Sequence, residues 1–150
     1  MTLLVVEQLS KSFGGVRAIA ELDLQIHEGA VHSIIGPNGA GKTSLINLLS
    51  GVYAPAAGSI RLDGRELAGQ ATHQFAQAGI GRTFQNLQVF FNMTALENVM
   101  TGRHLRQPCS LLASLLHTPA LRRGEAACRS SARQLLAQVG LEAYADAAAD

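Results

Sequence analysis

The stretch GPNGAGKTS, residues 36–44, constrains the fold of this chain more than any other feature. It lies between a short, mostly apolar run at residues 31–35 and a run that has leucines at helical spacing and ends at Gly51. This order predicts a buried strand, a tight glycine loop, and a helix that begins at Lys42 and stops at the glycine. The sequence therefore predicts an α/β unit built around one loop.

Within this stretch, Gly36, Gly41, Lys42 and Thr43 satisfy the pattern GxxxxGK(S/T). Glycines lack a Cβ atom, so such a loop can turn its N–H groups inward and approach a phosphate closely, at a helix end whose dipole also attracts anions. The lysine would reach the outer phosphates, the threonine hydroxyl would ligate Mg²⁺, and Ser44 would be a further phosphate donor. The alternative is a glycine-rich turn with an incidental surface lysine. The predicted cradle comprises Gly36, Pro37, Asn38, Gly39, Ala40, Gly41, Lys42, Thr43 and Ser44.

Period-2 alternation predicts further strands around this unit. LLVVEQL at residues 3–9 and LDLQI at residues 22–26 are predicted to form an antiparallel lead-in. GSIRLDG at residues 58–64 and GIGRTF at residues 79–84 are two more candidates. The predicted fold class is α/β, with a mixed sheet whose N-terminal strands are antiparallel.

Helix signals dominate the rest of the chain. Thr94 and Glu97 form a capping-box pattern that predicts a helix through about Gln107. Thr118 followed by Pro119 predicts a second helix start. Apolar residues at helical spacing in this second helix predict one buried stripe, made of Ala132, Leu135, Leu136 and Val139.

These patterns predict two parts of the chain. Residues 1–92 are expected to form the α/β core with the glycine loop, and residues 93–150 a helical subdomain. The alanine-rich tail AYADAAAD is expected to be helical, because alanine favours helix over strand.

Composition excludes some classes of partner. The 12 basic and 11 acidic residues leave a net charge of +1 and no basic stripe, so nucleic acid is not expected as a partner. Cys109 and Cys128 are far apart and lack metal-type spacing, which indicates reduced cytosolic thiols. No apolar stretch reaches the roughly 18 to 20 residues of a membrane span, so the chain is expected neither to span a membrane nor to be exported. A membrane role would come through a partner.

Five segments, KSFGG, GPNGAGKTS, AGSIRLDG, GIGRTFQN and NMTALENV, occur in an order that strongly resembles the ATP-binding subunits of ABC transporters. Among these, the chain looks like the ATPase subunits of branched-chain amino-acid importers or of the related urea and short-amide importers. The resemblance implies a P-loop NTPase fold of the ABC type that binds ATP and Mg²⁺ and hydrolyses ATP to drive uptake. It also implies a dimer of ATPase subunits, transmembrane permease partners, an indirect link to a periplasmic solute-binding protein, and a peripheral location at the cytoplasmic face of the inner membrane.

The resemblance also implies roles for residues outside the glycine loop. Phe13 would stack on adenine with Val16 beside the ring, although Phe13 could instead be an ordinary core residue. Gln85 matches the glutamine that approaches the metal ion and the attacking water, although an ordinary surface glutamine in a turn is the alternative. The implied catalytic residues are therefore Lys42 and Gln85, and the implied metal ligands are Thr43 and Gln85.

Four elements of such ATPases are not found in the sequence: the LSGGQ-type signature, the strand ending in Asp-Glu, the D-loop and the switch histidine. The resemblance is therefore to the N-terminal part of a longer protein. The chain alone is expected to bind nucleotide without hydrolysing it, and to expose a sheet edge that makes it marginally stable. A nucleotide-binding fragment without turnover and a P-loop kinase are the alternative functions.

Overall fold

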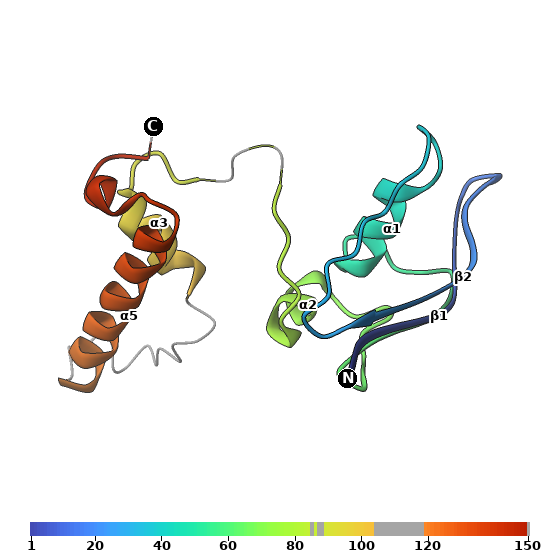
Figure 1. Ribbon diagram of the computed structural model, residues 1–150, viewed down its shortest axis with the longest axis horizontal. Coiled ribbons are helices and arrows are strands. Elements are labelled where there is room, and N and C mark those ends of the chain that lie inside the picture. Colours follow the sequence, from blue (N-terminus) through green and yellow to red (C-terminus); the bar gives the residue numbers. More distant parts are fainter. Residues whose placement is uncertain (85, 87–88, 104–118, 150) are drawn as a thin grey trace. The chain divides into compact units, whose positions relative to one another are not determined.

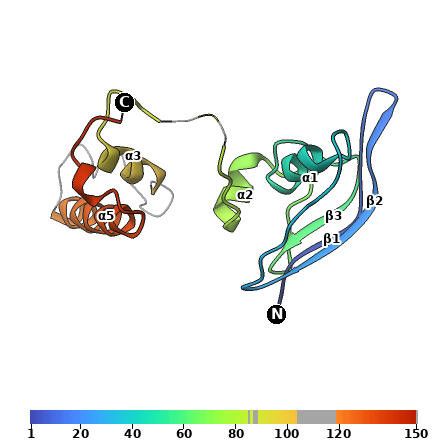
Figure 2. The same cartoon turned by 45° about the horizontal axis from the view of Figure 1, so that its top comes forward.

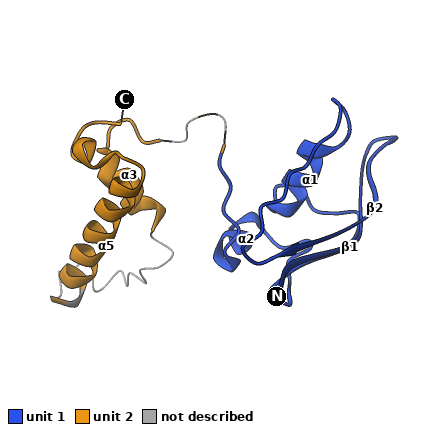
Figure 3. Cartoon of the chain, viewed as in Figure 1, with its two compact units in different colours: residues 1–83 blue, residues 84–150 orange. Residues whose placement is uncertain are grey.

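The computed structural model describes residues 1–84, 86, 89–103 and 119–149. The chain divides into two compact units, residues 1–83 and residues 84–150 (Figure 3). The predicted division of this chain into residues 1–92 and 93–150 stays a prediction. Each unit is described by itself below.

Unit 1 contains an antiparallel sheet of four strands in the order β2-β1-β3-β4 (Figures 1 and 2). The strands are β1 (Thr2–Phe13), β2 (Val16–His27), β3 (Ala57–Leu62) and β4 (Arg65–Glu66). The two first strands are longer than the alternating runs predicted, because the hairpin pairing continues to Phe13 and Val16 beside the turn. The antiparallel lead-in and the α/β class are confirmed.

A bulge at Gln8 changes which residues of β1 face the core. Leu4 and Val6 are buried two residues apart, and the next buried residue is Leu9. Gln8 has a φ of 49°, and the register of β1 against β2 shifts between Val6 and Leu9. The Asp23 carboxylate accepts hydrogen bonds from the Gln8 backbone N–H at 2.7 Å and from its side-chain amide at 2.8 Å. Asp23 therefore satisfies the polar groups that the bulge removes from the strand ladder.

Two helices complete unit 1, α1 (Lys42–Leu49) and α2 (Thr72–Ala78). The first is the helix predicted after the glycine loop. The second was missed, because its single buried residue, Phe75, gives no periodic apolar pattern. The core of the unit combines residues of the sheet and of both helices: Leu4, Val6, Leu9, Ile19, Leu45, Leu48, Ile60, Leu67 and Phe75.

The buried strand predicted at residues 31–35 is wrong. These residues form no strand, and the side chains of Val31 and Ile35 are 97% and 92% exposed. A short apolar run becomes a buried strand only when neighbouring strands take its hydrogen bonds. None of the described strands pairs with residues 31–35, so these residues do not become part of a sheet.

The strand predicted at residues 79–84 is also wrong, since residues 80–84 have no regular structure. Gly79 instead ends α2 with a φ of 107°. Side-chain hydrogen bonds attach the segment to α1, because the guanidinium of Arg82 donates to the Asn47 side-chain oxygen at 2.7 Å and to the Ser50 hydroxyl at 2.9 Å. The segment is therefore anchored by side chains and not by a strand ladder.

Unit 2 contains α3 (Ala95–Gly102), α5 (Pro119–Gln138) and the 3₁₀ turn η2 (Glu142–Tyr144). Its core consists of Leu96, Ala132, Leu136 and Ala145. The predicted apolar stripe of α5 is half wrong: Leu135 is 42% and Val139 68% exposed. The buried side chains of α5 are instead spaced four residues apart, at Cys128, Ala132 and Leu136. The reason is that α5 packs against the short helix α3, and this contact covers a narrower strip of α5 than the predicted apolar stripe.

Two predicted helix ends in unit 2 are wrong. The helix after Thr94 ends at Gly102, where Arg103 caps it, and not at Gln107, which lies outside the described residues. The alanine-rich tail is not helical after η2: Ala148 forms an isolated antiparallel bridge with Thr94. Ala145 is buried against Leu96, so burial and bridging override the helix preference of alanine.

The capping box predicted at the start of α3 is present. The Thr94 hydroxyl accepts from the Glu97 backbone N–H at 3.2 Å, and the Glu97 carboxylate accepts from the Thr94 backbone N–H at 2.8 Å and its hydroxyl at 3.1 Å. These bonds from the Thr94 backbone and hydroxyl hold the pKa of Glu97 below its ordinary value of 4.5.

This pKa predicts an acid-sensitive helix start. A carboxyl group with a lowered folded-state pKa stabilises the fold fully above 4.5, and this contribution is lost as the pH falls through the lowered value. When the pH is lowered from about 6 to about 3, we expect the free energy of unfolding to decrease less in Glu97→Gln than in the unmodified chain. The reason is that glutamine keeps a hydrogen-bond acceptor at this position and does not titrate. Urea unfolding at several pH values measures this, and an unchanged pH dependence in the variant would contradict it.

Among the described residues, no helix is both long and apolar enough to cross a membrane. Cys128 is a buried free thiol, and Cys109 lies outside the described residues.

Candidate functional site

The glycine loop is positioned by the close contact of Gly41 with β2. Gly41 has a φ of 81° and is the N-cap of α1. A Cβ atom at this position would lie 2.5 Å from the Ala18 carbonyl oxygen and 3.0 Å from the Ile19 side chain. Only glycine combines the left-handed backbone with so close an approach to a neighbouring strand. The start of α1 is therefore held directly against β2.

The backbone of the loop presents unpaired hydrogen-bond donors. The Ala40 N–H donates to the Pro37 carbonyl at 3.3 Å, and the Leu45 N–H donates to the Gly41 carbonyl at 2.8 Å. The other N–H groups of residues 39–45 donate to no described residue. They belong to Gly39, Gly41, Lys42, Thr43 and Ser44. Consecutive free N–H groups at a helix N-terminus form an anion site.

The ammonium group of Lys42 folds back over the same loop. Its Nζ atom donates to the carbonyl oxygens of Gly36 and Pro37, each at 2.6 Å. The Lys42 ammonium therefore lies against the loop that precedes it in the sequence, and Lys42 lines the same groove as residues 38–41. The positive charge, the free donors and the helix dipole all favour an anion at one place.

A groove of about 320 Å³ runs between this loop and β2. The cradle contributes residues 38–44 to its lining, and β2 contributes Val16, Arg17 and Ala18. The loop and the tip of the β1–β2 hairpin lie at the same end of unit 1 (Figure 1). Val16 and the predicted phosphate cradle therefore line the same groove; the predicted place of Val16 beside an adenine ring stays a prediction. Gly36 and Pro37 contribute their carbonyl groups to Lys42 and do not line the groove.

Phe13 lies beside this groove but does not line it. It is the cross-strand partner of Val16 in the hairpin, and paired residues of an antiparallel ladder face the same side. The residue is 42% exposed, and its ring contacts the Tyr53 ring edge-on, with centroids 5.1 Å apart. Phe13 is therefore neither an ordinary core residue nor part of the groove wall.

Gln85 lies outside the described residues, so its predicted role stays a prediction. The segment before it is near the cradle, because Arg82 lines a cavity of about 420 Å³ together with Lys42, Thr43 and Ile46. His32 and Ile34 of the segment predicted as a strand line the same cavity.

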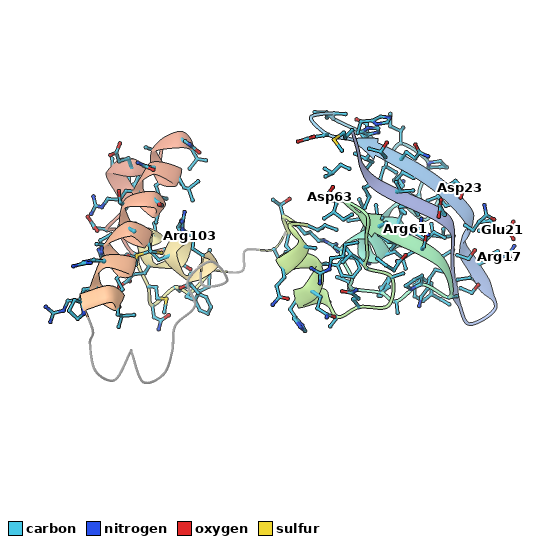
Figure 4. All side chains as sticks on the ribbon, turned by 90° about the horizontal axis from the view of Figure 1, so that it is seen from below. Arg17, Glu21, Asp23, Arg61, Asp63 and Arg103 are labelled. Atoms are coloured by element: carbon cyan, nitrogen blue, oxygen red, sulfur yellow. The ribbon has the colours of Figure 1, made fainter. Side chains whose placement is uncertain are left out.

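Sequence reasoning missed two groups near the site. Arg17, on β2 beside Val16 (Figure 4), is among the residues that line the groove. Lys11 and Tyr53 surround the Phe13 ring. Neither position has a local signal. Successive side chains of a strand point to opposite faces, so Val16 does not predict the place of Arg17, and the approach of Tyr53 depends on the loop after α1.

Arg61, labelled in Figure 4, is a charged group of unit 1 that has structural partners. The Arg61 guanidinium lies 3.0 Å from the Glu7 carboxylate and 3.4 Å from the Glu66 carboxylate, across three strands of the sheet. These groups are about half exposed and stabilise the sheet only weakly. They do not belong to the groove.

The residues of the groove fit a magnesium–polyphosphate ligand. Mg²⁺ usually keeps several waters and takes only one or two protein oxygens when phosphates supply the rest. Thr43 offers a hydroxyl in the first turn of α1 within the groove. A carboxylate-rich cage is not needed, and the described residues contain no group of three histidine, cysteine or acidic side chains that could hold a metal ion.

Two relatives found by comparison with known proteins share one description. The chain is 43% identical over 147 residues to the high-affinity branched-chain amino acid transport ATP-binding protein BraF of Pseudomonas aeruginosa, across 98% of this chain and 58% of BraF. It is 40% identical over 144 residues to LivG of Salmonella typhimurium, a protein of the same description, across 96% of this chain and 56% of LivG. The chain therefore spans little more than half the length of these curated relatives.

A solved structure shows the same fold. The ADP conformation of an ATP-binding cassette of an ABC transporter matches with a TM-score of 0.77 at 28% identity, over 99% of this chain and 58% of that one. The protein family described as "ABC transporter" matches residues 19–150. Because this match includes the phosphate cradle and most of the sequence, the chain belongs to the ABC transporter family of ATP-binding proteins.

Proposed function

We propose that the complete protein is the ATP-binding subunit of an ABC importer, which couples ATP binding and hydrolysis to uptake of branched-chain amino acids or a related small polar solute. The observation that carries the proposal is the groove lined by residues 38–44, a loop that combines free backbone donors with the Lys42 ammonium. The names of BraF and LivG, which describe ATP-binding proteins of branched-chain amino acid transport, support the choice of solute.

Each residue of the site has a proposed task. The N–H groups of the loop hold the phosphates in place, and the Lys42 ammonium neutralises the outer phosphates. The Thr43 hydroxyl holds Mg²⁺, and the ion supplies charge neutralisation for phosphoryl transfer to water when it is bound. Phe13 stacks on the adenine base, and Val16 lies beside the ring. Gln85 would orient the metal ion and the attacking water.

The complete protein is also proposed to act as a dimer with a second ATP-binding subunit and to bind transmembrane permease subunits. A periplasmic solute-binding protein would deliver the solute. The subunit would then lie at the cytoplasmic face of the inner membrane through its permease partners. Binding of ATP to the closed dimer would drive the transporter, since a ligand shifts an equilibrium toward the state it binds more tightly.

Transport by the complete protein tests this proposal. In cells that carry Lys42→Ala in the complete gene, we expect uptake of labelled leucine to fall to the level of a deletion strain, with the variant protein present at normal abundance. Labelled urea and acetamide test the related solutes in the same cells. Unchanged uptake of all three solutes would refute an importer of this type. Transfer of phosphate to an added acceptor by the purified protein, in place of free phosphate release, would instead indicate a kinase.

A further inference from the structure

The aromatic ring of Phe13 is held in one orientation by two residues that the proposed function does not use. Lys11 and Phe13 are two apart on β1, so their side chains lie on the same side of the strand. The Lys11 Nζ atom is 5.3 Å from the centroid of the Phe13 ring. At this distance a cation over an aromatic face is attracted by the ring quadrupole.

The Lys11 side chain is itself fixed at its far end. Its Nζ atom donates to the Ala54 carbonyl oxygen at 2.6 Å and lies 6.0 Å from the Tyr53 ring centroid. Tyr53 packs against the core of unit 1, and its backbone N–H donates to the Asn47 carbonyl at 3.1 Å. The loop after α1 therefore gives a rigid support to which the end of the hairpin is attached.

Together these contacts leave the Phe13 ring partly free. Tyr53 meets it edge-on at an interplanar angle of 69°, and the ammonium group occupies a position over the ring, yet 42% of the residue is exposed. An exposed aromatic side chain that is already held in place loses less rotamer freedom when a second flat ring stacks on it. Its neighbour Val16 lies at the end of the groove that holds the phosphate cradle.

We propose that Lys11 is a positioning residue for the base of the nucleotide: it links the Phe13 ring to the Ala54 carbonyl and so presets the surface on which a purine stacks. This inference rests on the proposed nucleotide site and adds a residue to it. Lys11 is not among the residues that line the groove of the phosphate cradle. Loss of Lys11 therefore weakens recognition of the base and leaves recognition of the phosphates unchanged.

A double-mutant cycle tests this role. Affinity for Mg-ATP is measured by calorimetry for the unmodified chain, Lys11→Met, Phe13→Leu and the double variant. Methionine keeps the length and apolar stem of lysine without its charge, and we expect it to weaken binding by about two- to fivefold, the size of an exposed cation–π contact. In the Phe13→Leu background the same substitution should have no further effect. Lys11→Arg should restore most of the affinity, because a guanidinium also stacks on aromatic faces and donates to carbonyls.

The second ligand is Mg-tripolyphosphate, which has no base. Its affinity, measured by displacement of ATP, should be the same for the unmodified chain and Lys11→Met. The proposal would be overturned if Lys11→Met weakened the affinity for Mg-ATP and for Mg-tripolyphosphate equally. It would also be overturned if Lys11→Met weakened Mg-ATP binding as much in the Phe13→Leu background as in the unmodified chain. Failure of the unmodified chain to bind either ligand would refute the nucleotide site itself, which is a different result. Circular dichroism of each variant separates these outcomes from loss of the fold.

Discussion

Lys42→Ala is expected to weaken binding of Mg-ATP by about ten- to a hundredfold, because a hydrogen bond from a charged donor contributes about 1.5–3 kcal/mol. The fold should survive. Among the residues that the structure describes, the Lys42 ammonium donates only to the carbonyl groups of Gly36 and Pro37 in its own loop, and alanine is a good residue for the first turn of a helix. Calorimetric titration measures the affinity, and urea unfolding measures the stability.

A matched control removes one positive charge elsewhere in unit 1. Arg65 is exposed on β4 and does not line the groove. Arg65→Ala should leave the affinity for Mg-ATP within about twofold of the unmodified chain, because exposed charges separated by more than a Debye length of about 8 Å are largely screened. Equal losses in the two variants would show that net charge, and not the Lys42 contact, determines binding.

Gly41→Ala is expected to lower the free energy of unfolding by about 3 kcal/mol. A left-handed backbone costs a residue with a Cβ atom about 1–2 kcal/mol, and overpacking adds about 1–3 kcal/mol. The overpacking arises at β2, because the new methyl group would lie 2.5 Å from the Ala18 carbonyl oxygen. The loop would therefore have to move away from β2. Urea unfolding followed by circular dichroism measures the loss.

Gly39 is the control for this substitution. Its φ of 82° matches the 81° of Gly41, but a Cβ atom there would meet nothing within 4 Å. Gly39→Ala should therefore lose only the backbone cost of about 1–2 kcal/mol. If the two variants lose the same stability, the contact between the loop and β2 does not hold the cradle in place.

The sequence predicted those parts of the site whose structure depends on residues close together in the chain. The glycine loop, the start of α1 at Lys42 and the capping box of Thr94 and Glu97 each depend on residues within one turn of each other. Their backbone preferences and hydrogen bonds are therefore contained in a few consecutive positions. The cross-strand pair of Phe13 and Val16 also lies within one hairpin.

The predictions that failed depend on distant partners. Residues 31–35 and 79–84 have the composition of buried strands, but a strand needs neighbours to take its hydrogen bonds, and the described residues provide none. The chain spans 58% of the length of BraF. The exposed side chains of Val31 and Ile35 are thus apolar surface that this part of the family fold does not cover. Likewise, the exposure of Leu135 and Val139 depends on how wide the contact with α3 is, which periodicity does not show.

The central claim is that the free N–H groups of Gly39 and of residues 41–44, together with the Lys42 ammonium, bind the polyphosphate of ATP. Equilibrium dialysis of the folded chain against labelled ATP, with and without Mg²⁺, tests it most directly. The account predicts saturable uptake of about one ATP per chain, weaker without Mg²⁺ and displaced by tripolyphosphate. A chain that is folded by circular dichroism and shows no saturable uptake of ATP would contradict it.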